Sequence, residues 1–489
     1  MRPLVLTPLL VPLGTALLAA LLHRQDRARR VVSLAGGLVL LGCAVALVAE
    51  VLREGRLSVP LGGWPLPYGI EMAADPLGAG LVLVAAALAV AVLLQQHSSA
   101  DPAPESPALH PLLHGLLAAV GGAFLTADLF NLYVWFELML VTTLGLMVLG
   151  GEARHLDATF KYLVLSLFGT VVLLLAVALI YGATGHLHLP TLAAAATGPH
   201  GAALPVLVTV LTLALLLKAG AFPLFGWLPA SYHTLSAPLL ALVGGLLTKV
   251  AVYAVLRLLG GVFHGSPPAL YQALGWLAVA TMVTGVLGAA YHWDLRRILA
   301  FHIVSQVGYL LLGIALASAA GAVATVFFTV HNILAKAALF LIAGVVWRLA
   351  GHYDLRRVGG LYEARPGLAL LFLLAAGALV GVPPLSGFWA KLLLVRASLS
   401  AEEYLWAAAA LGVSLLTLYS MVKIWLEVFW KPHSGPRDPG APVTGLGPAY
   451  AGASLLVALT LAMGLAPEPF LRYAEAAVAA LATAGGTAP

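Results

Sequence analysis

Charged residues are scarce in this sequence. They make up 9% of its 489 residues, and 61% are hydrophobic, whereas a soluble domain carries about 25% charged residues. The polar stretches between the apolar runs are too short to fold as a separate water-soluble domain. The composition excludes an ordinary soluble protein and predicts a polytopic helical membrane protein.

Several motifs are also absent. Cys43 is the only cysteine, which excludes a disulfide within the chain. The sequence has no HExxH motif, cysteine pair, P-loop or dinucleotide-binding fingerprint, so no cofactor is indicated and the metal, if any, is unknown. Basic residues are spread singly apart from the run Arg27–Arg30, so the pI near 9.3 does not predict a nucleic-acid partner.

Long apolar runs are what the sequence has in abundance. Windows of about 20 apolar residues predict an all-α polytopic membrane protein with about fourteen transmembrane helices. The predicted spans are 4–22, 31–51, 75–95, 110–127, 130–149, 161–182, 204–225, 236–258, 271–290, 299–317, 322–347, 367–394, 405–425 and 448–466. The run 4–22 is too long for a typical signal peptide, so we expect it to be retained as the first helix.

The distribution of arginine and lysine predicts the orientation. The connections after the first, fifth, ninth, eleventh and thirteenth spans hold most of the basic residues outside the membrane. Because cytoplasmic loops are enriched in Lys and Arg, we expect both termini to lie outside a prokaryotic plasma membrane.

A short motif occurs twice and predicts an internal repeat. Pro223–Trp227 reads Pro-Leu-Phe-Gly-Trp, and Pro384–Phe388 reads Pro-Leu-Ser-Gly-Phe, five predicted helices later. An odd number of helices reverses direction, so the two copies would be inverted, as in transporters with discontinuous helices. We therefore predict a broken seventh helix and a broken twelfth helix. A chance match in a chain rich in Gly and Pro is the alternative.

The predicted repeats divide the chain into four parts. Residues 1–109 hold three N-terminal helices, 110–258 the first five-helix repeat, 271–425 the second five-helix repeat, and 426–489 the last helix with a short tail.

Ionisable residues inside the predicted spans are the candidate functional site. Each charged lysine at the bilayer centre costs at least ~3 kcal/mol, yet four of the seven lysines lie there, together with one glutamate. These residues are Glu137, Lys218, Lys249, Lys336 and Lys391. Buried ionisable groups in series suit a proton relay, because burial and neighbouring charges shift their pKa values. Snorkelling lysines and a structural ion pair are the alternatives.

Histidines and hydroxyl residues accompany these lysines. His331 and Asn332 lie about one turn before Lys336, and a neutral imidazole can both accept and donate a proton. A polar stripe on span 299–317 would face the bundle interior or form a helix seam, and a weaker stripe on span 161–182 is expected to serve packing. The first stripe is His302, Ser305, Gln306 and Tyr309, and the second is Tyr162, Ser166 and Thr170.

Other polar residues lie near span ends. We expect Asp128 to cap a helix. His110, His114, His233 and His292 are expected to take interface or loop roles rather than catalytic ones.

Several stretches, spread over nearly the whole chain, resemble a known family. The sequence resembles the antiporter-like subunits of respiratory complex I, and most closely the D-subunit family of Mrp-type multisubunit cation/proton antiporters. The stretches that carry the resemblance are Gly62–Pro65 with Tyr68–Ile70, Asn131–Glu137, Leu246–Val250, Asp294–Ala300 with Ser305–Tyr309, His331–Phe340 and Gly381–Phe388.

The resemblance implies roles for the buried residues. It implies a Glu137–Lys218 pair, a central Lys249, and an exit path through Lys336 and Lys391. Relatives often carry an acid in the turn after the Trp-Leu-Pro of the seventh helix, but this chain has Ala230 and Ser231 there, so no acid acts at that turn. The short stretch after the last span is expected to distinguish the chain from the largest Mrp subunit and the distal complex I subunit.

The predicted function is that of a secondary transporter subunit, not an enzyme. Its partners would be other subunits of a multisubunit Na⁺/H⁺ antiporter, the lipid bilayer, protons and Na⁺. Glu137, Lys218, Lys249, His331, Lys336 and Lys391 would relay protons. The alternative is a proton-pumping module of a redox complex, such as complex I or a membrane-bound hydrogenase. Five buried ionisable groups argue against a passive scaffold.

Overall fold

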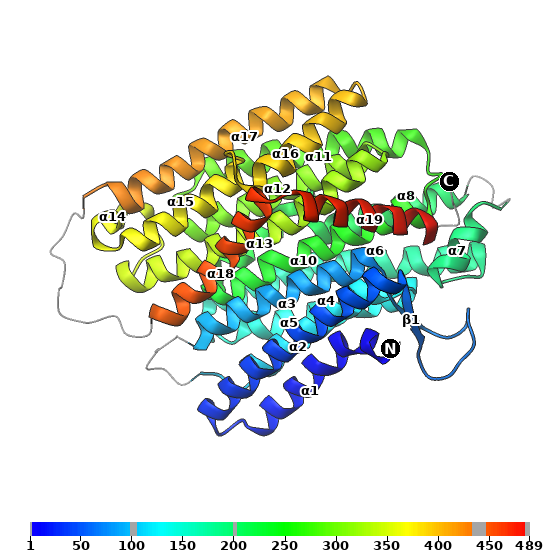
Figure 1. The fold of residues 1–489 in the computed structure, drawn as a ribbon, viewed down its shortest axis with the longest axis horizontal. Helices are drawn as coiled ribbons and strands as arrows, with labels where there is room; N and C mark the ends of the chain where they lie inside the picture. The colour runs from blue at the N-terminus through cyan, green and yellow to red at the C-terminus, as the bar shows by residue number, and fades with distance from the viewer. Residues whose placement is uncertain (1, 98–104, 199–202, 433–445, 485–489) are drawn as a thin grey trace.

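Long helices running side by side form the whole body of the protein. The computed structural model describes residues 2–97, 105–198, 203–432 and 446–484 (Figure 1). In this described part, twelve helices are long and apolar enough to cross a membrane, and two shorter apolar helices, Leu109–Leu125 and Pro366–Val380, complete the set. Each of the fourteen predicted spans therefore has its helix, and the predicted fold class is confirmed.

The helices and strands have the following bounds. They are α1 (Thr7–Leu21), α2 (Asp26–Glu54), β1 (Leu57–Pro60), β2 (Glu71–Ala74), α3 (Pro76–His97), α4 (Leu109–Leu125), α5 (Leu129–Val148), α6 (Ala153–Thr184), α7 (Leu189–Ala196), α8 (Ala203–Ala219), α9 (Trp227–Ser231), α10 (Ala237–Arg257), α11 (Pro268–Tyr291), α12 (Leu295–Ala315), α13 (Ala319–Ala350), α14 (Leu361–Ala364), α15 (Pro366–Val380), α16 (Ser386–Ser400), α17 (Tyr404–Ile424), α18 (Leu446–Leu465) and α19 (Glu468–Ala484).

Three helices form the core of the bundle. Every residue of the apolar window of α10 is buried, as are 94% of that of α12 and 78% of that of α13, whereas α6 and α17 are mostly exposed. Glycines let these helices approach closely: a Cβ on Gly244 of α10 would lie 2.8 Å from Ile303 of α12. A polar side chain on α10, α12 or α13 is consequently shielded from lipid.

Both predicted helix breaks are present. The helix α8 ends at Gly220 (φ 74°), and α15 ends at Gly381 (φ 94°). Both angles are left-handed, a conformation that glycine adopts readily at helix C-termini, and a proline follows each within a few residues. The chain then resumes as α9 after the first break and as α16 after the second.

Matching junctions support the predicted inverted repeat. Asp128 caps α5 by accepting a hydrogen bond from the Asn131 N–H (2.7 Å), which confirms its predicted role. Asp294 caps α12 in the same way. Each aspartate also forms an isolated antiparallel bridge with the segment that follows two helices later, Asp128 with His188 and Asp294 with Asp354. The domain boundaries drawn from the repeat remain predictions, and part of the last one (433–445 and 485–489) lies outside the described residues.

Several elements lie outside the predicted spans, among them two strands and two helices. The strands β1 and β2 pair as an antiparallel hairpin whose loop carries the Gly62–Pro65 motif. The short helix α7 follows α6, and α19 packs along α3 and α13 beyond the last predicted span. These elements are too short or too amphipathic for a hydropathy window to detect.

Candidate proton-relay site

Two lysines occupy the core of the bundle. Lys249 of α10 and Lys336 of α13 are both fully buried. The Lys249 ammonium donates to the Gly244 carbonyl of its own helix (3.0 Å), and the Lys336 ammonium donates to the Leu299 carbonyl of α12 (3.2 Å). Their ammonium groups are close enough for their charges to interact. A proton that arrives on one lysine therefore disfavours a proton on the other.

The third lysine lies at the second helix break. Lys391 of α16 donates to the Val380 carbonyl at the end of α15 and to the Ser414 hydroxyl of α17, both at 2.7 Å. Its ammonium also lies 5.2 Å from the centre of the Tyr309 ring. The break exposes the last carbonyls of α15, where the helix dipole favours a cation, so the broken helix itself supplies the lysine site.

The fourth lysine lies beside the first helix break. Lys218 of α8 donates to the Ser166 carbonyl (2.9 Å) and to the Thr170 hydroxyl of α6. The packing role predicted for the stripe on span 161–182 was therefore wrong for Thr170, whose hydroxyl accepts from this lysine, whereas Ser166 contributes its backbone carbonyl. Their helical spacing was visible in the sequence, but the helix they faced was not.

Glu137 does not pair directly with Lys218. Among the described residues, no salt bridge joins Glu137 to a cation, and its Oε1 is buried without a hydrogen-bond partner. Its charge still acts on Lys218 over a longer distance. Glu137 lies on the outward stripe of α5 that includes the exposed residues Phe130, Val134 and Val141. The contact implied by the resemblance is thus absent in this arrangement of the chain.

Polar side chains of α12 and α13 lie near Lys336 and Lys391. His331 bonds through Nδ1 to the Ser386 hydroxyl at the start of α16 (2.8 Å), and its Nε2 has no partner in the part of the chain that the structure describes. His302 bonds to Ser420 (2.9 Å). Asn332 lies 3.5 Å from Gln306, a long contact. The stripe on span 299–317 therefore faces the bundle interior, one of the two alternatives that the sequence left open.

The four lysines share one property. Each ammonium is held by backbone carbonyls or hydroxyl groups, and no described residue forms a salt bridge with any of the four. Neutral acceptors stabilise a lysine proton less than a carboxylate does. The arrangement can therefore bind and release protons without first breaking an ion pair.

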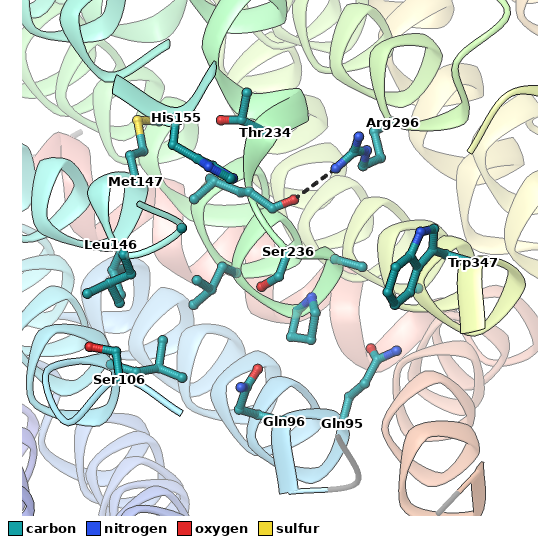
Figure 2. Close-up of a pocket in the computed structure, with 18 of the residues that line it drawn as sticks. Gln95, Gln96, Ser106, Leu146, Met147, His155, Thr234, Ser236, Arg296 and Trp347 are labelled. Atoms are coloured by element: carbon teal, nitrogen blue, oxygen red, sulfur yellow. Dashed lines mark hydrogen bonds between the residues drawn. The ribbon is translucent and has the colours of Figure 1, made fainter. Parts of the chain in front are cut away.

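A cavity of about 390 Å³ opens at the end of the bundle that is rich in arginine. We call this the basic end, defined by Arg30, Arg154, Arg296 and Arg348. Figure 2 shows Gln95 and Gln96 on one side of the cavity and Arg296 on the other. The cavity reaches Ala237 at the start of α10, seven residues from Gly244, the acceptor of Lys249, which is about 10 Å along the helix axis.

Comparison with known proteins identifies the family. Residues 126–417 match the family described as NADH:quinone oxidoreductase/Mrp antiporter, TM. The chain is 37% identical to the D subunit of the Na⁺/H⁺ antiporter of Alkalihalophilus pseudofirmus, over 97% of this chain and 96% of that protein. It superposes on a chain of the Mrp complex from a Dietzia species with a TM-score of 0.89 and 31% identity, over 98% of both chains.

A chain of respiratory complex I from Thermus thermophilus shares the fold, with a TM-score of 0.85 and 24% identity over 99% of this chain and 100% of that one. With its buried lysines, its two broken helices and these likenesses, the chain belongs to the NADH:quinone oxidoreductase/Mrp antiporter family of membrane proteins.

Proposed function

We propose that this protein is the proton-translocating subunit of a multisubunit Na⁺/H⁺ antiporter in a prokaryotic plasma membrane. The row of four lysines with only neutral acceptors carries the proposal. The printed names of the relatives, which are Na⁺/H⁺ antiporter D subunits and an Mrp complex, support the same function.

In the proposed mechanism, protons reach Lys249 from one side, pass to Lys336 and leave by way of Lys391. Repulsion between Lys249 and Lys336 favours a single proton on the two, so a second proton displaces the first. His331 and the polar groups around it bridge the space between Lys336 and Lys391. The buried surroundings strengthen each charge interaction because water does not screen it.

Glu137 and Lys218 gate this transfer in the proposal. A movement that brings the two side chains together would hold Lys218 charged, and the field on Lys249 would change as a result. Glu137 is half-buried on an outward stripe of α5, and a carboxylate so close to lipid is costly. We therefore infer that another subunit of the antiporter complex covers this stripe.

The test is Na⁺-dependent proton movement in inverted vesicles that contain the whole complex. Collapse of a preformed pH gradient on addition of Na⁺, lost in the Lys249→Ala complex, supports the proposal. The second candidate is the redox-driven pump, which the fold shared with complex I supports. If Na⁺ has no effect while a reduced electron donor drives proton movement, that candidate replaces antiport.

A further inference from the structure

Two histidines outside the lysine row form a hydrogen-bonded chain between α2 and α4. The Ser33 hydroxyl of α2 bonds to His110 Nδ1 and to His114 Nε2 of α4, each at 2.8 Å. His110 is 2% exposed and His114 is fully buried. Both histidines therefore lie within α4 rather than in a loop, and the interface role predicted for them stays a prediction. One turn of α4 separates them, so the chain leads into the bundle.

The outer end of this chain reaches the cavity at the basic end. Glu105 lines that cavity, and its Oε1 lies 3.5 Å from His110 Nε2. Glu105 also binds Arg30 (2.7 Å) and Gln96 (2.9 Å). Burial would raise the pKa of Glu105, but hydrogen bonds from His110, Arg30 and Gln96 outweigh it and lower the pKa to about 2. Glu105 is therefore a carboxylate that only accepts hydrogen bonds.

The carboxylate of Glu105, 3.5 Å from His110 Nε2, favours a proton on that nitrogen and so orients the hydrogen bonds of the resting chain. His110 presents Nε2–H to the carboxylate, so its bare Nδ1 accepts from the Ser33 hydroxyl. Ser33 in turn accepts from His114 Nε2–H, which leaves His114 Nδ1 without a proton. This nitrogen is buried and has no hydrogen-bond partner among the described residues. The inner end of the chain is thus an open proton acceptor.

A proton can cross this chain with every atom accounted for. A proton that binds His114 Nδ1 releases the Nε2 proton to Ser33, Ser33 passes its own proton to His110 Nδ1, and His110 gives its Nε2 proton to Glu105. After this transfer every hydrogen bond in the chain is reversed and His110 Nε2 is bare, so a proton on Glu105 can next pass through His110 and Ser33 to His114, which releases its Nδ1 proton inward. At 3.5 Å the step between His110 and Glu105 is longer than an ordinary hydrogen bond, and it shortens when His110 is charged.

The surroundings contain few other charges. On α2, Arg29 binds Asp26 (2.8 Å) and Arg30 binds Glu105. The helix α1 has no ionisable side chain, and α3 has only His97 at its end. The ionisable residues of the other helices packed on α4 are Tyr133 and Glu137 of α5 and Lys249, Tyr253 and Arg257 of α10, all beyond the level of His114. The charges nearest to the two histidines among the described residues are therefore Glu105 and Arg30 at the outer end of the chain.

We propose that Glu105, His110, Ser33 and His114 form a second proton-binding site, which exchanges protons with the cavity at the basic end and whose occupancy sets the pH range of cation/proton exchange. The inference rests on the proposed function. Histidine suits the task because a neutral imidazole can both accept and donate a proton. Collection of protons limits the rate where protons are scarce, so the site acts on the alkaline side of the pH profile.

The test is the pH profile of Na⁺-dependent exchange by the whole complex in inverted vesicles. His114→Gln and Ser33→Ala should each move the alkaline half-maximum down by at least about half a pH unit, a threefold change in proton concentration. The matched controls are His97→Gln, an exposed histidine at the same end, and Ser398→Ala, a buried serine bonded only to its own helix (2.9 Å). Both controls should retain the wild-type profile.

Two outcomes overturn the inference. One is a wild-type profile in His114→Gln and Ser33→Ala, and the other is an equal loss of rate at every pH, which marks a structural role. If the wild-type complex performs no exchange, the proposed function fails, and infrared difference spectra between pH 5 and pH 9 test the proton site directly. Imidazole bands that vanish in His114→Gln support the site, and unchanged bands refute it.

Discussion

At each helix break, one lysine donates to one backbone carbonyl and one hydroxyl group. Lys218 uses Ser166 and Thr170, and Lys391 uses Val380 and Ser414. The carbonyl differs in origin: Val380 ends the broken helix itself, whereas Ser166 lies within the unbroken α6. At the second break the lysine is therefore part of the structure that holds the broken helix in place.

The two sites also face different surroundings. Lys391 lies beside the Tyr309 ring and opposite His331, inside the bundle. Lys218 is less buried and is influenced by Glu137 on the outward stripe of α5. The two breaks thus differ: the lysine at the second break is enclosed in the bundle, and the lysine at the first break is less buried. This contrast suggests that the first break senses and the second break conducts.

The largest expected effect comes from the glycine shared by the two copies of the motif. A Cβ on Gly387 would lie 1.8 Å from the Ala378 carbonyl, whereas a Cβ on Gly226 would meet nothing within 4 Å. Gly387→Ala should therefore displace α15 from α16 and cost about 3 kcal/mol or more, with loss of folded protein. Gly226→Ala, its matched control, should leave both thermal unfolding and exchange unchanged. If both alanine variants fold and exchange equally well, the two breaks do not differ in packing as the structure predicts.

The second largest effect is expected from Glu137, the carboxylate whose charge acts on the lysine at the first break. Glu137→Gln should lower the exchange rate about a hundredfold or more, equivalent to ~3 kcal/mol, because Lys218 loses the negative charge that acts on it. Glu137 has no salt bridge among the described residues, so the thermal unfolding temperature of the isolated chain should stay the same. Full exchange in Glu137→Gln vesicles would contradict the gating role of the first break.

The hydroxyl acceptors should have intermediate effects. Ser414 accepts from Lys391 and also donates to Val380 (2.9 Å), whereas Thr170 only accepts from Lys218. One lost hydrogen bond to a charged group changes a rate by roughly tenfold, so Thr170→Val should lower exchange by about that factor and Ser414→Ala by more. Initial rates of Na⁺-dependent proton movement measure both. A larger loss in Thr170→Val would reverse the assignment of the conducting break.

The sequence was sufficient for the spans and the lysines, because hydropathy and the cost of a buried charge are local properties. It could not show the acceptors: Gly244, Leu299 and Val380 hold lysines through backbone carbonyls, which any residue possesses. Ser386, the partner of His331, lies within the repeated motif, so the repeat was the one feature of the sequence that could have pointed to it. The missing Glu137–Lys218 contact depends on side-chain orientation across two helices, which spacing along one helix does not determine.

The smallest expected effect is a difference in stability between the two matching junctions, Asp128–His188 in the first predicted repeat and Asp294–Asp354 in the second. At the first junction, Glu71 of β2 bonds to His188 (3.0 Å) and Arg56 (2.6 Å). Burial would raise the pKa of Glu71, but these hydrogen bonds and the Arg56 charge lower it below its ordinary 4.5. The Glu71 carboxylate therefore contributes to the stability of the fold above about pH 4.5. This contribution is lost as the pH falls through the lowered pKa of the folded state.

Glu71→Gln should lower the free energy of unfolding by about 1–2 kcal/mol at pH 7, and by less as the medium becomes acidic. Asp354 lies at the second junction and is half-exposed. Its carboxylate accepts a hydrogen bond from the backbone N–H of Arg356 (3.0 Å). Asp354→Asn should change the stability by a few tenths of a kcal/mol. Thermal unfolding in detergent at pH 7 and pH 4 measures both variants. Since the hairpin anchors only the first junction, a pH-dependent loss in Glu71→Gln alone would locate the acid-sensitive contact in the first repeat.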